Sequence, residues 1–404
     1  MYDAIVVGAR CAGSPLAMLL ARQGYRVLLV DRATYPSDTI STHFIWPPGV
    51  ACLKRWGLLD RLRATGCPAV YEIGFDPGPF SYKGAPPGVD GVQEMYGPRR
   101  TVLDKLLLDA AAEAGAEVRE AFTVTEIVSS DGRVTGIRGH RRKEPDIGES
   151  ARIIVGADGR HSLVARSVGA EEYSARPPAT CVYYSYWRGV PPHDVTIRMR
   201  GDRVLISTPV NDGLTIAIVI SPIGAFDTAK PDVEGHFRAA INRAPELAAL
   251  LEQGERVEPF YGTGDIENFF RKPYGEGWAL VGDAGYHKDP CTAQGISDAF
   301  RSAEWLVEAI DAGFSGTCEM KEAMAGYQRT RDEHFLPMYE MTYGMAQIQE
   351  PPPAPVLALQ AALRNNQSEI DRFFGTLAGT VAIPEFYSAD NVGRILAKAN
   401  AASA

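Results

Sequence analysis

The chain has 404 residues, 45% of them hydrophobic and 23% charged, which is the composition of an ordinary globular protein with two or three structural units. Its 41 basic and 50 acidic residues give a net charge of −9, so a nucleic-acid partner is not expected. No apolar run is long enough to span a bilayer, no signal peptide precedes the first predicted strand, and the six cysteines form no C-x-x-C pair. We therefore expect a cytoplasmic protein without disulfides, a metal site or a membrane span.

The chain opens with a pattern of strand, helix and strand. The stretch "YDAIVVG" is apolar and rich in β-branched residues, which is typical of a strand buried on both faces. Apolar residues at helical spacing follow from Ala12 to Gln23, with Pro15 in the first turn and Gly24 at the expected C-cap. The stretch "RVLLVDR" is the next buried strand. Together these segments predict a βαβ unit.

The following segment, from Ile40 to Gly97, is rich in proline and glycine, with one short helix predicted over Val50–Leu62. The amphipathic stretch "RRTVLDKLLLDAAAEAGAEV" then predicts a helix that ends at Gly115. "AFTVTEIVSSDGRVTGIRG" predicts a hairpin with an Asp-Gly turn, and "ARIIVGADG" predicts a buried strand that enters a glycine turn.

The residue pattern changes in residues 173–262. Segments in which apolar and polar residues alternate predict strands joined by tight turns, and a helical stretch follows around Val233–Glu252. "GWALVGDAG" then returns to the pattern of a buried strand and a glycine turn, and a long helix is predicted over Gly295–Asp311. We predict an α/β protein built from three parts. These are a discontinuous Rossmann-like domain (1–75, 96–172 and 263–330), an inserted and mostly antiparallel β-sheet substrate domain (76–95 and 173–262), and a helical C-terminal region (331–404).

The first glycine turn has the pattern of a dinucleotide-binding loop, except that Arg10 stands where the usual middle glycine would be. Gly8 would make the tight turn and Gly13 would let the helix pack closely on the strand, while the helix N-terminus favours a pyrophosphate. Asp31 ends the second strand, where a carboxylate can accept the ribose hydroxyls. The Arg10 side chain would either lie along the phosphates or reach an acidic neighbour.

Two more turns place an aspartate beside a glycine at the end of a buried strand, at Asp158-Gly159 and at Gly282-Asp283. Three such turns require a ligand longer than a nicotinamide dinucleotide. At this point the chain resembles the FAD-dependent monooxygenases related to para-hydroxybenzoate hydroxylase, a superfamily that includes flavin halogenases, epoxidases and geranylgeranyl reductases. The resemblance covers roughly Met1 to Asp311.

The resemblance implies a glutathione reductase-type FAD-binding domain with FAD as the cofactor. Within the family, the arginine at the head of "RRTVLDKLL" points at the cofactor, the D-G motif lies near the pyrophosphate and is linked to NADPH use, and the G-D carboxylate holds the ribityl chain. The helix that starts at Gly295 faces the flavin ring, and Pro290 shapes the wall beside it. The cofactor-binding residues that this resemblance and the motifs predict are Gly8, Arg10, Gly13, Asp31, Arg32, Arg99, Arg100, Val124, Asp158, Gly159, Gly282, Asp283, Ala293, Gln294, Gly295 and Ile296.

Several reactions are compatible with this cofactor. In the main interpretation, NAD(P)H acts as a transient reductant, or a separate flavin reductase supplies reduced flavin, and molecular oxygen is the co-substrate. A flavin C4a-hydroperoxide then hydroxylates or epoxidises a small to medium apolar or aromatic molecule. The first alternative is an oxygen-independent reductase of the geranylgeranyl reductase type. The second is a halogenase, although the W-x-W-x-I-P stretch is missing and Lys83 is the one lysine considered for that chemistry. The third is an escort or binding module on the same fold.

The predicted active-site residues follow the second strand and open the inserted domain. His43 and Thr42, in "STHFIWPPG", are expected near the flavin ring, where His43 would move a proton and Pro290 would line the site. A loop histidine bonded to backbone is an equal alternative for His43. Trp46 and one face of the strand around residues 183–187, with Tyr184 and Tyr186, are expected to contact substrate, with ordinary core packing as the alternative.

Overall fold

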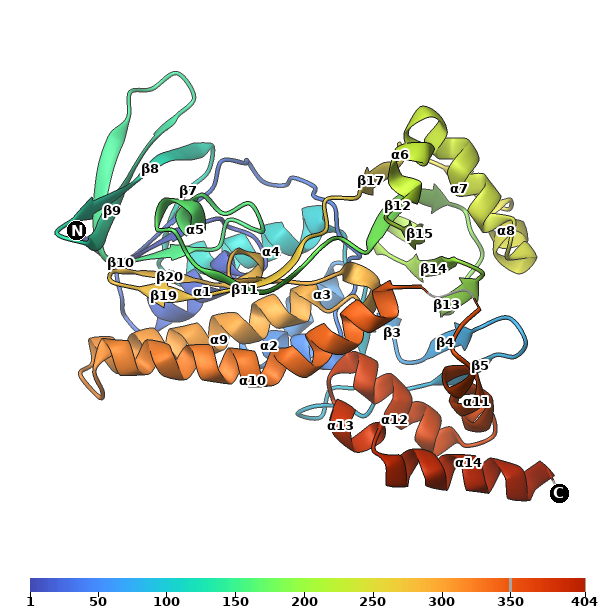
Figure 1. The fold of residues 1–404 in the computed structure, drawn as a ribbon. Coiled ribbons are helices and arrows are strands. Elements are labelled where there is room, and N and C mark those ends of the chain that lie inside the picture. Colours follow the sequence, from blue (N-terminus) through green and yellow to red (C-terminus); the bar gives the residue numbers. More distant parts are fainter. Residues whose placement is uncertain (349–350, 404) are drawn as a thin grey trace.

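The computed structural model of the protein describes residues 1–348 and 351–403 and contains two large sheets with helices around them (Figure 1). Gln349, Glu350 and Ala404, which belong to the predicted C-terminal region, lie outside the described residues. The fold confirms the predicted α/β class, with a Rossmann-like domain, an inserted sheet and C-terminal helices.

The first sheet carries the predicted βαβ unit. Its path is β19 (Tyr274–Gly275), β20 (Trp278–Leu280), β10 (Ile147–Gly156), β1 (Tyr2–Val7), β2 (Val27–Val30) and β7 (Glu117–Arg119). The strands from β20 to β7 run parallel. Parallel strands need crossovers, and the buried, apolar character of β1 and β2 matches a sheet covered on both faces.

Alternate residues of the first sheet face two different layers. Val6 and Leu29 pack against α1 (Gly13–Arg22), α4 (Arg100–Glu113) and α9 (Gly295–Phe314). Ile5 and Leu28 face the other layer, which contains the hairpin β8 (Phe122–Ser130) and β9 (Arg133–Arg141) and the short helix α5 (Leu163–Ser167). Because successive side chains of a strand point to opposite faces, this alternation determines which face of the sheet packs against the helices.

The second sheet is mostly antiparallel, as predicted. Its path is β16 (Glu255–Arg256), β12 (Thr180–Arg188), β15 (Leu214–Pro222), β14 (Arg203–Pro209), β13 (Val195–Arg200), β4 (Ile73–Asp76) and β5 (Tyr82–Gly84), and β17 (Tyr261–Thr263) also pairs with β12. Tyr183 and Trp187 pack against α6 (Ala225–Ala229), α7 (Val233–Ile241) and α8 (Pro245–Leu251). Tyr184 and Tyr186 point to the opposite face of the same strand.

A small sheet of β11 (Glu172–Arg176), β18 (Asn268–Arg271) and β21 (Tyr286–His287) lies where the chain leaves the first sheet and returns to it. The connection between β2 and β4 contains α2 (Pro47–Arg55), α3 (Leu59–Ala64) and β3 (Ala69–Val70), and β3 pairs with β6 (Met95–Tyr96). The single helix predicted over 50–62 is therefore wrong. Gly57, with φ +73°, separates two helices because the left-handed conformation ends α2.

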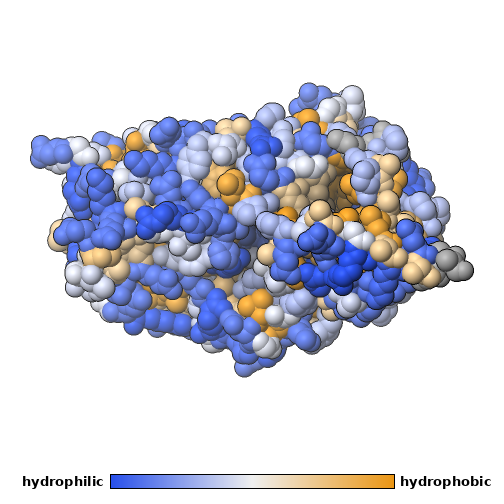
Figure 2. Space-filling view, turned by 60° about the horizontal axis from the view of Figure 1, so that its bottom comes forward, coloured by the Kyte–Doolittle hydropathy of each residue, from blue (hydrophilic) through white to orange (hydrophobic). Residues whose placement is uncertain are grey.

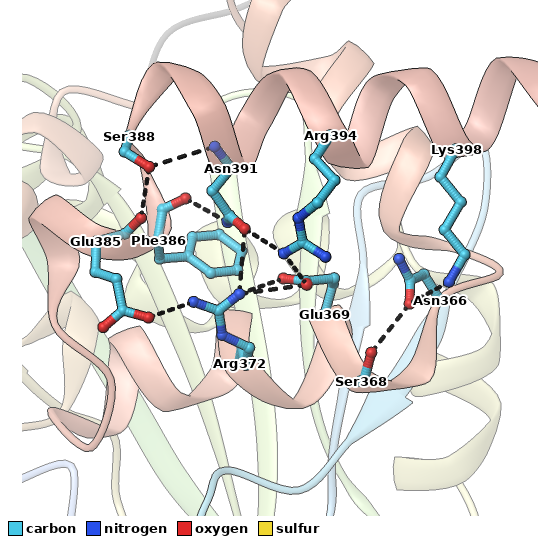
Figure 3. Close-up of polar contacts among 10 residues, drawn as sticks. All are labelled: Asn366, Ser368, Glu369, Arg372, Glu385, Phe386, Ser388, Asn391, Arg394 and Lys398. Atoms are coloured by element: carbon cyan, nitrogen blue, oxygen red, sulfur yellow. Dashed lines mark hydrogen bonds and ion pairs between the residues drawn. The ribbon is translucent and has the colours of Figure 1, made fainter.

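The C-terminal helices cover the edge of the second sheet (Figure 1). α10 (Met320–Ala346) packs along α9, and α11 (Ala354–Leu363), α12 (Gln367–Ala378), α13 (Ile383–Phe386) and α14 (Ala389–Ser403) follow. Phe373 and Phe374 of α12 pack against Tyr82 of β5. The buried carboxylate of Glu369 binds Arg372 and also Arg394 of α14, which ties these helices together (Figure 3).

Two of the predicted domain boundaries differ from the elements. β4 begins at Ile73, so the substrate sheet starts three residues before the predicted boundary at 76, and the boundary at 331 falls inside α10. Figure 2 shows hydrophilic side chains over most of the face that carries α10 and α14, with small hydrophobic patches between them. Every helix in the described ranges falls short of the combined length and apolar character that a bilayer crossing requires.

Candidate active site

A cavity of about 860 Å³ lies between the two sheets, and the three predicted glycine turns all contribute to its wall. Residues of β12 and β15 line it from the other side, including Tyr184 and Ile218. The predicted site residues that line this cavity are Gly8, Arg10, Asp31, Arg32, Thr42, Arg100, Val124, Asp158, Gly159, Tyr184, Gly282, Asp283, Pro290, Ala293, Gly295 and Ile296.

The three turns approach one another through their glycines. A Cβ atom on Gly8, whose φ is +104°, would lie 2.4 Å from the carbonyl oxygen of Ala157 in the second turn. A Cβ on Gly282 would lie 2.7 Å from the Ala12 side chain at the start of α1. A Cβ on Gly13 would lie 1.8 Å from the Gly8 carbonyl oxygen. Glycine is therefore required at Gly8 and Gly13 by close packing of backbone, and at Gly282 by the Ala12 methyl group and a φ of +59°, whatever ligand the cavity holds.

Arg10 does not obstruct the first turn, because its side chain reaches an acidic neighbour. Its Nη1 lies 2.5 Å from Asp104 on α4, and its Nη2 donates to the Ser37 hydroxyl at 3.1 Å. Asp104 is fully buried and also accepts from Arg100 Nε at 3.0 Å. Burial opposes the charge of Arg100, but Asp104 holds the Arg100 pKa above its ordinary value. The sequence analysis missed Asp104, although its position four residues after Arg100 on a helix was a usable signal.

Two of the predicted acidic site residues, Asp31 and Asp158, are held by backbone amides. Asp31 accepts from the amides of Ala9 at 2.7 Å and Ala33 at 2.8 Å. Asp158 Oδ2 accepts from the Leu163 amide at 2.6 Å, while its buried Oδ1 has no partner among the described residues. Burial raises the pKa of Asp158. Asp158 lines the cavity, and a ligand hydroxyl would satisfy this unpartnered acceptor.

Two helix N-termini open on the same cavity. α1 begins at Gly13 next to the first turn, and α9 begins at Gly295, where a Cβ would meet nothing within 4 Å. In the described structure no side chain caps either helix. At α1 the Ser14 amide donates to the Arg10 carbonyl at 3.1 Å and Pro15 has no N–H, so α9, whose Gly295 and Ile296 line the cavity, is the helix that can offer its first amides to a ligand. The uncapped start of α9, the unpartnered Asp158 oxygen and a cavity lined by all three glycine turns fit FAD, which carries a pyrophosphate and a ring that is anionic when reduced.

Six predicted site residues lie behind the cavity wall. Gly13 packs under the first turn, Trp46 Nε1 donates to the Thr292 carbonyl at 3.0 Å, and Gln294 donates to the Leu377 carbonyl of α12. The structure separates the predicted arginine pair, because Arg100 lines the cavity and Arg99 does not. Together with Gly13, the residues outside the lining are His43, Trp46, Arg99, Tyr186 and Gln294.

His43, Tyr186 and Arg99 form a connected group between the two domains. His43 is fully buried with φ +61°, and its Nε2 lies 2.6 Å from the Tyr186 hydroxyl. Arg99 stacks 4.5 Å from the centre of the Tyr186 ring and pairs with Glu258 at 2.6 Å. Burial, and then the charge of Arg100, lower the pKa of His43 to about 3. The imidazole is therefore neutral at pH 7 and interacts with the second sheet rather than with the cavity.

Comparison with known proteins identifies the family. A model described as "FAD binding domain" matches residues 1–335. A tryptophan 2-halogenase of Chondromyces crocatus is 24% identical over 353 residues, which are 82% of this chain and 65% of that protein, so the chain spans less than two thirds of its length. A digeranylgeranylglycerophospholipid reductase of Methanosarcina mazei is 28% identical over 362 residues, 83% of each chain.

Solved structures share the fold. A flavoprotein/dehydrogenase from Cytophaga hutchinsonii has a TM-score of 0.84 at 19% identity, with all of both chains covered. A probable FAD-dependent monooxygenase from Pseudomonas aeruginosa has a TM-score of 0.70 at 20% identity, covering 93% of this chain and 98% of that one. With the family model covering most of the chain, the protein belongs to the FAD-binding domain family and is an FAD-dependent oxidoreductase.

Proposed function

We propose that the protein is an NAD(P)H-dependent monooxygenase that hydroxylates or epoxidises a small to medium apolar or aromatic molecule. The observation that carries the proposal is the single cavity that joins the three glycine turns to the apolar face of the second sheet. Val182, Tyr184 and Ile218 belong to that face, and Ile266, in the loop after β17, packs with them. A cofactor ring at the start of α9 and an apolar substrate against these side chains would share one cavity.

FAD, when bound and reduced, supplies the activation of molecular oxygen. The chain's own residues orient the substrate and exclude water. Tyr184 is buried and presents its ring to the cavity, and Thr42 offers a hydroxyl beside it. His43, neutral and hydrogen-bonded to Tyr186, holds that tyrosine in place rather than exchanging protons with solvent. The apolar wall supports a reaction in which water must be kept away from the reacting atoms.

An oxygen-independent reductase and a halogenase are the competing functions, since characterised relatives carry both names. The lysine considered for halogenation does not favour that reaction. Lys83 lies on the edge strand β5, is half exposed and pairs with Asp194. It is absent from the described lining of the cavity.

A stopped-flow experiment tests the proposal. The purified holoprotein is reduced with NADPH or NADH without oxygen and is then mixed with aerated buffer. We expect a transient absorbance that matches neither reduced nor oxidised flavin, followed by recovery of the oxidised spectrum. Direct reoxidation without a transient, together with substrate turnover in the absence of oxygen, would favour the reductase. If neither nicotinamide reduces the flavin, a separate reductase must supply the electrons.

A further inference from the structure

A buried ion pair lines the cavity between the third glycine turn and the start of α9. Lys288 is 7% exposed and Asp298 is 6% exposed, and the Lys288 ammonium pairs with the Asp298 carboxylate. The same ammonium lies 4.9 Å from the centre of the Tyr286 ring. Both charged residues belong to the cavity wall. The sequence analysis did not select either of them.

The position of the pair gives it an electrostatic role in addition to packing. Lys288 is two residues before Pro290, and Asp298 is in the first turn of α9, which begins at Gly295. All four residues line the cavity. Charges in a poorly solvated site act strongly on a neighbouring group whose own charge changes, because little water is present to screen them. Reduction of a flavin adds negative charge to its ring, and nearby charges change the stability of that state.

We propose that the Lys288–Asp298 pair sets the reduction potential of the bound flavin. Lys288 stabilises the negatively charged reduced ring, and Asp298 limits that effect by balancing the lysine charge. The inference rests on the proposed function, since it requires the flavin ring to lie at the start of α9. In this arrangement both residues are positioning residues that act on the cofactor without exchanging a proton or an electron.

The two charges predict opposite effects when each is removed. Asp298→Asn leaves an unbalanced ammonium, so the reduced flavin is favoured and the midpoint potential rises. Lys288→Gln leaves an unbalanced carboxylate, so the midpoint potential falls. The double variant Lys288→Gln/Asp298→Asn restores a neutral site and returns the potential towards the wild-type value. A purely structural pair would lower the melting temperature in both single variants without opposite shifts in potential.

Spectroelectrochemical titration of the FAD-loaded proteins measures this directly. We expect each single variant to change the ratio of affinities for reduced and oxidised FAD by about tenfold, which is about 30 mV for a two-electron couple. Lys83→Gln removes a lysine from the exposed pair with Asp194 outside the cavity and is the matched control, with no expected shift. Lys288→Arg keeps the charge and is also expected to stay near the wild-type potential.

Two outcomes would overturn the proposal. In one, both single variants shift the potential in the same direction. In the other, neither shifts it more than Lys83→Gln does. If Lys288→Gln does not retain FAD, Asp298→Asn still must raise the potential and Lys288→Arg still must leave it unchanged. This test is independent of the test of the proposed function. If the variants shift the potential in opposite directions but the enzyme gives no oxygen-dependent transient, the role of the charge pair stands and only oxygenation is rejected.

Discussion

The two ends of the cavity are built in different ways. We name them after the proposed function: the side lined by the three glycine turns is the nucleotide end, and the side lined by β12 and β15 is the substrate end. At the nucleotide end, backbone turns pack directly on one another, as when Gly8 meets Ala157 and Gly13 meets Gly8. At the substrate end, the wall consists of side chains from β12 and β15, which become neighbours only through sheet pairing. A local backbone turn tolerates almost no added atom, whereas a wall of side chains can adjust. We therefore expect the nucleotide end to be the more sensitive to small substitutions and the substrate end to determine which molecules react.

The C-terminal helix α12 is attached to the cavity wall just before α9. Gln294, next to the start of α9, donates to the Leu377 carbonyl at the end of α12, so α12 is attached to the segment that closes the cavity. The same helix packs on β5 through Phe374. A change in α12 is therefore expected to alter the cavity wall beside the start of α9.

The largest expected effect is at the nucleotide end. Gly13→Ala places a Cβ 1.8 Å from the Gly8 carbonyl oxygen, so the first turn must move. We expect a loss of about 3 kcal/mol in the free energy of unfolding and loss of bound FAD. Thermal melts and the flavin absorbance of the purified protein measure both. Gly24→Ala is the control: a Cβ there meets nothing within 4 Å and only strains a residue at φ +90°, so FAD should remain bound.

The second effect concerns the C-terminal helices. Glu369→Gln removes a buried carboxylate that pairs with Arg372 at 2.9 Å and with Arg394 at 2.7 Å (Figure 3). Breaking such a pair should lower the free energy of unfolding by about 3 kcal/mol. This is the lower end of the range for buried ion pairs, because Arg394 is largely exposed. Hydrogen exchange should increase in α12 and α14 with no change in FAD content. Glu385→Gln, which breaks an exposed pair with Arg372, should cost less than about 1 kcal/mol.

A smaller effect is expected where the two domains meet. His43→Ala should keep FAD bound and slow substrate-dependent turnover by about tenfold. Loss of a group that transfers a proton directly would slow turnover by about a hundredfold or more. Tyr186→Phe removes the hydroxyl that pairs with His43 and should slow turnover to a similar extent. Because the two residues act through one contact, the double variant should be no slower than the worse single variant. Additive losses, or wild-type rates in His43→Ala, would contradict this role.

The last prediction is a pH dependence of stability. His43 in the unfolded chain binds a proton below about pH 6.5, whereas its folded-state pKa is about 3. Between these values the unfolded state binds more protons, so this contribution to stability is complete above about pH 6.5 and is lost as the pH falls towards 3. Urea titrations between pH 7 and pH 4 should show a smaller loss of stability for His43→Gln than for the wild type. Equal slopes for the two proteins would reject the low pKa.

Much of the nucleotide end was predictable because its signals are local. A continuous apolar strand, a glycine turn and a helix lie next to one another in the chain, so Gly8, Asp158 and Gly282 were recognised without tertiary information. The sequence did not show which of Arg99 and Arg100 lines the cavity. Adjacent side chains at the start of a helix point in different directions, and the packing of neighbouring elements decides which of them faces the cavity. Lys288 and Asp298 were missed for a similar reason, since ten residues separate them and only the turn before α9 brings them together.

The sequence by itself determined the α/β class and the three glycine turns, because each depends on local spacing and backbone conformation, and its resemblance to a known family implied FAD as the cofactor. The tertiary structure alone decided that Arg10 pairs with Asp104, that His43 is buried against Tyr186, and that Gln294 before α9 bonds to α12. These contacts join residues from 83 to 143 positions apart. No local pattern encodes such a contact, because it depends on how whole sheets and helices pack.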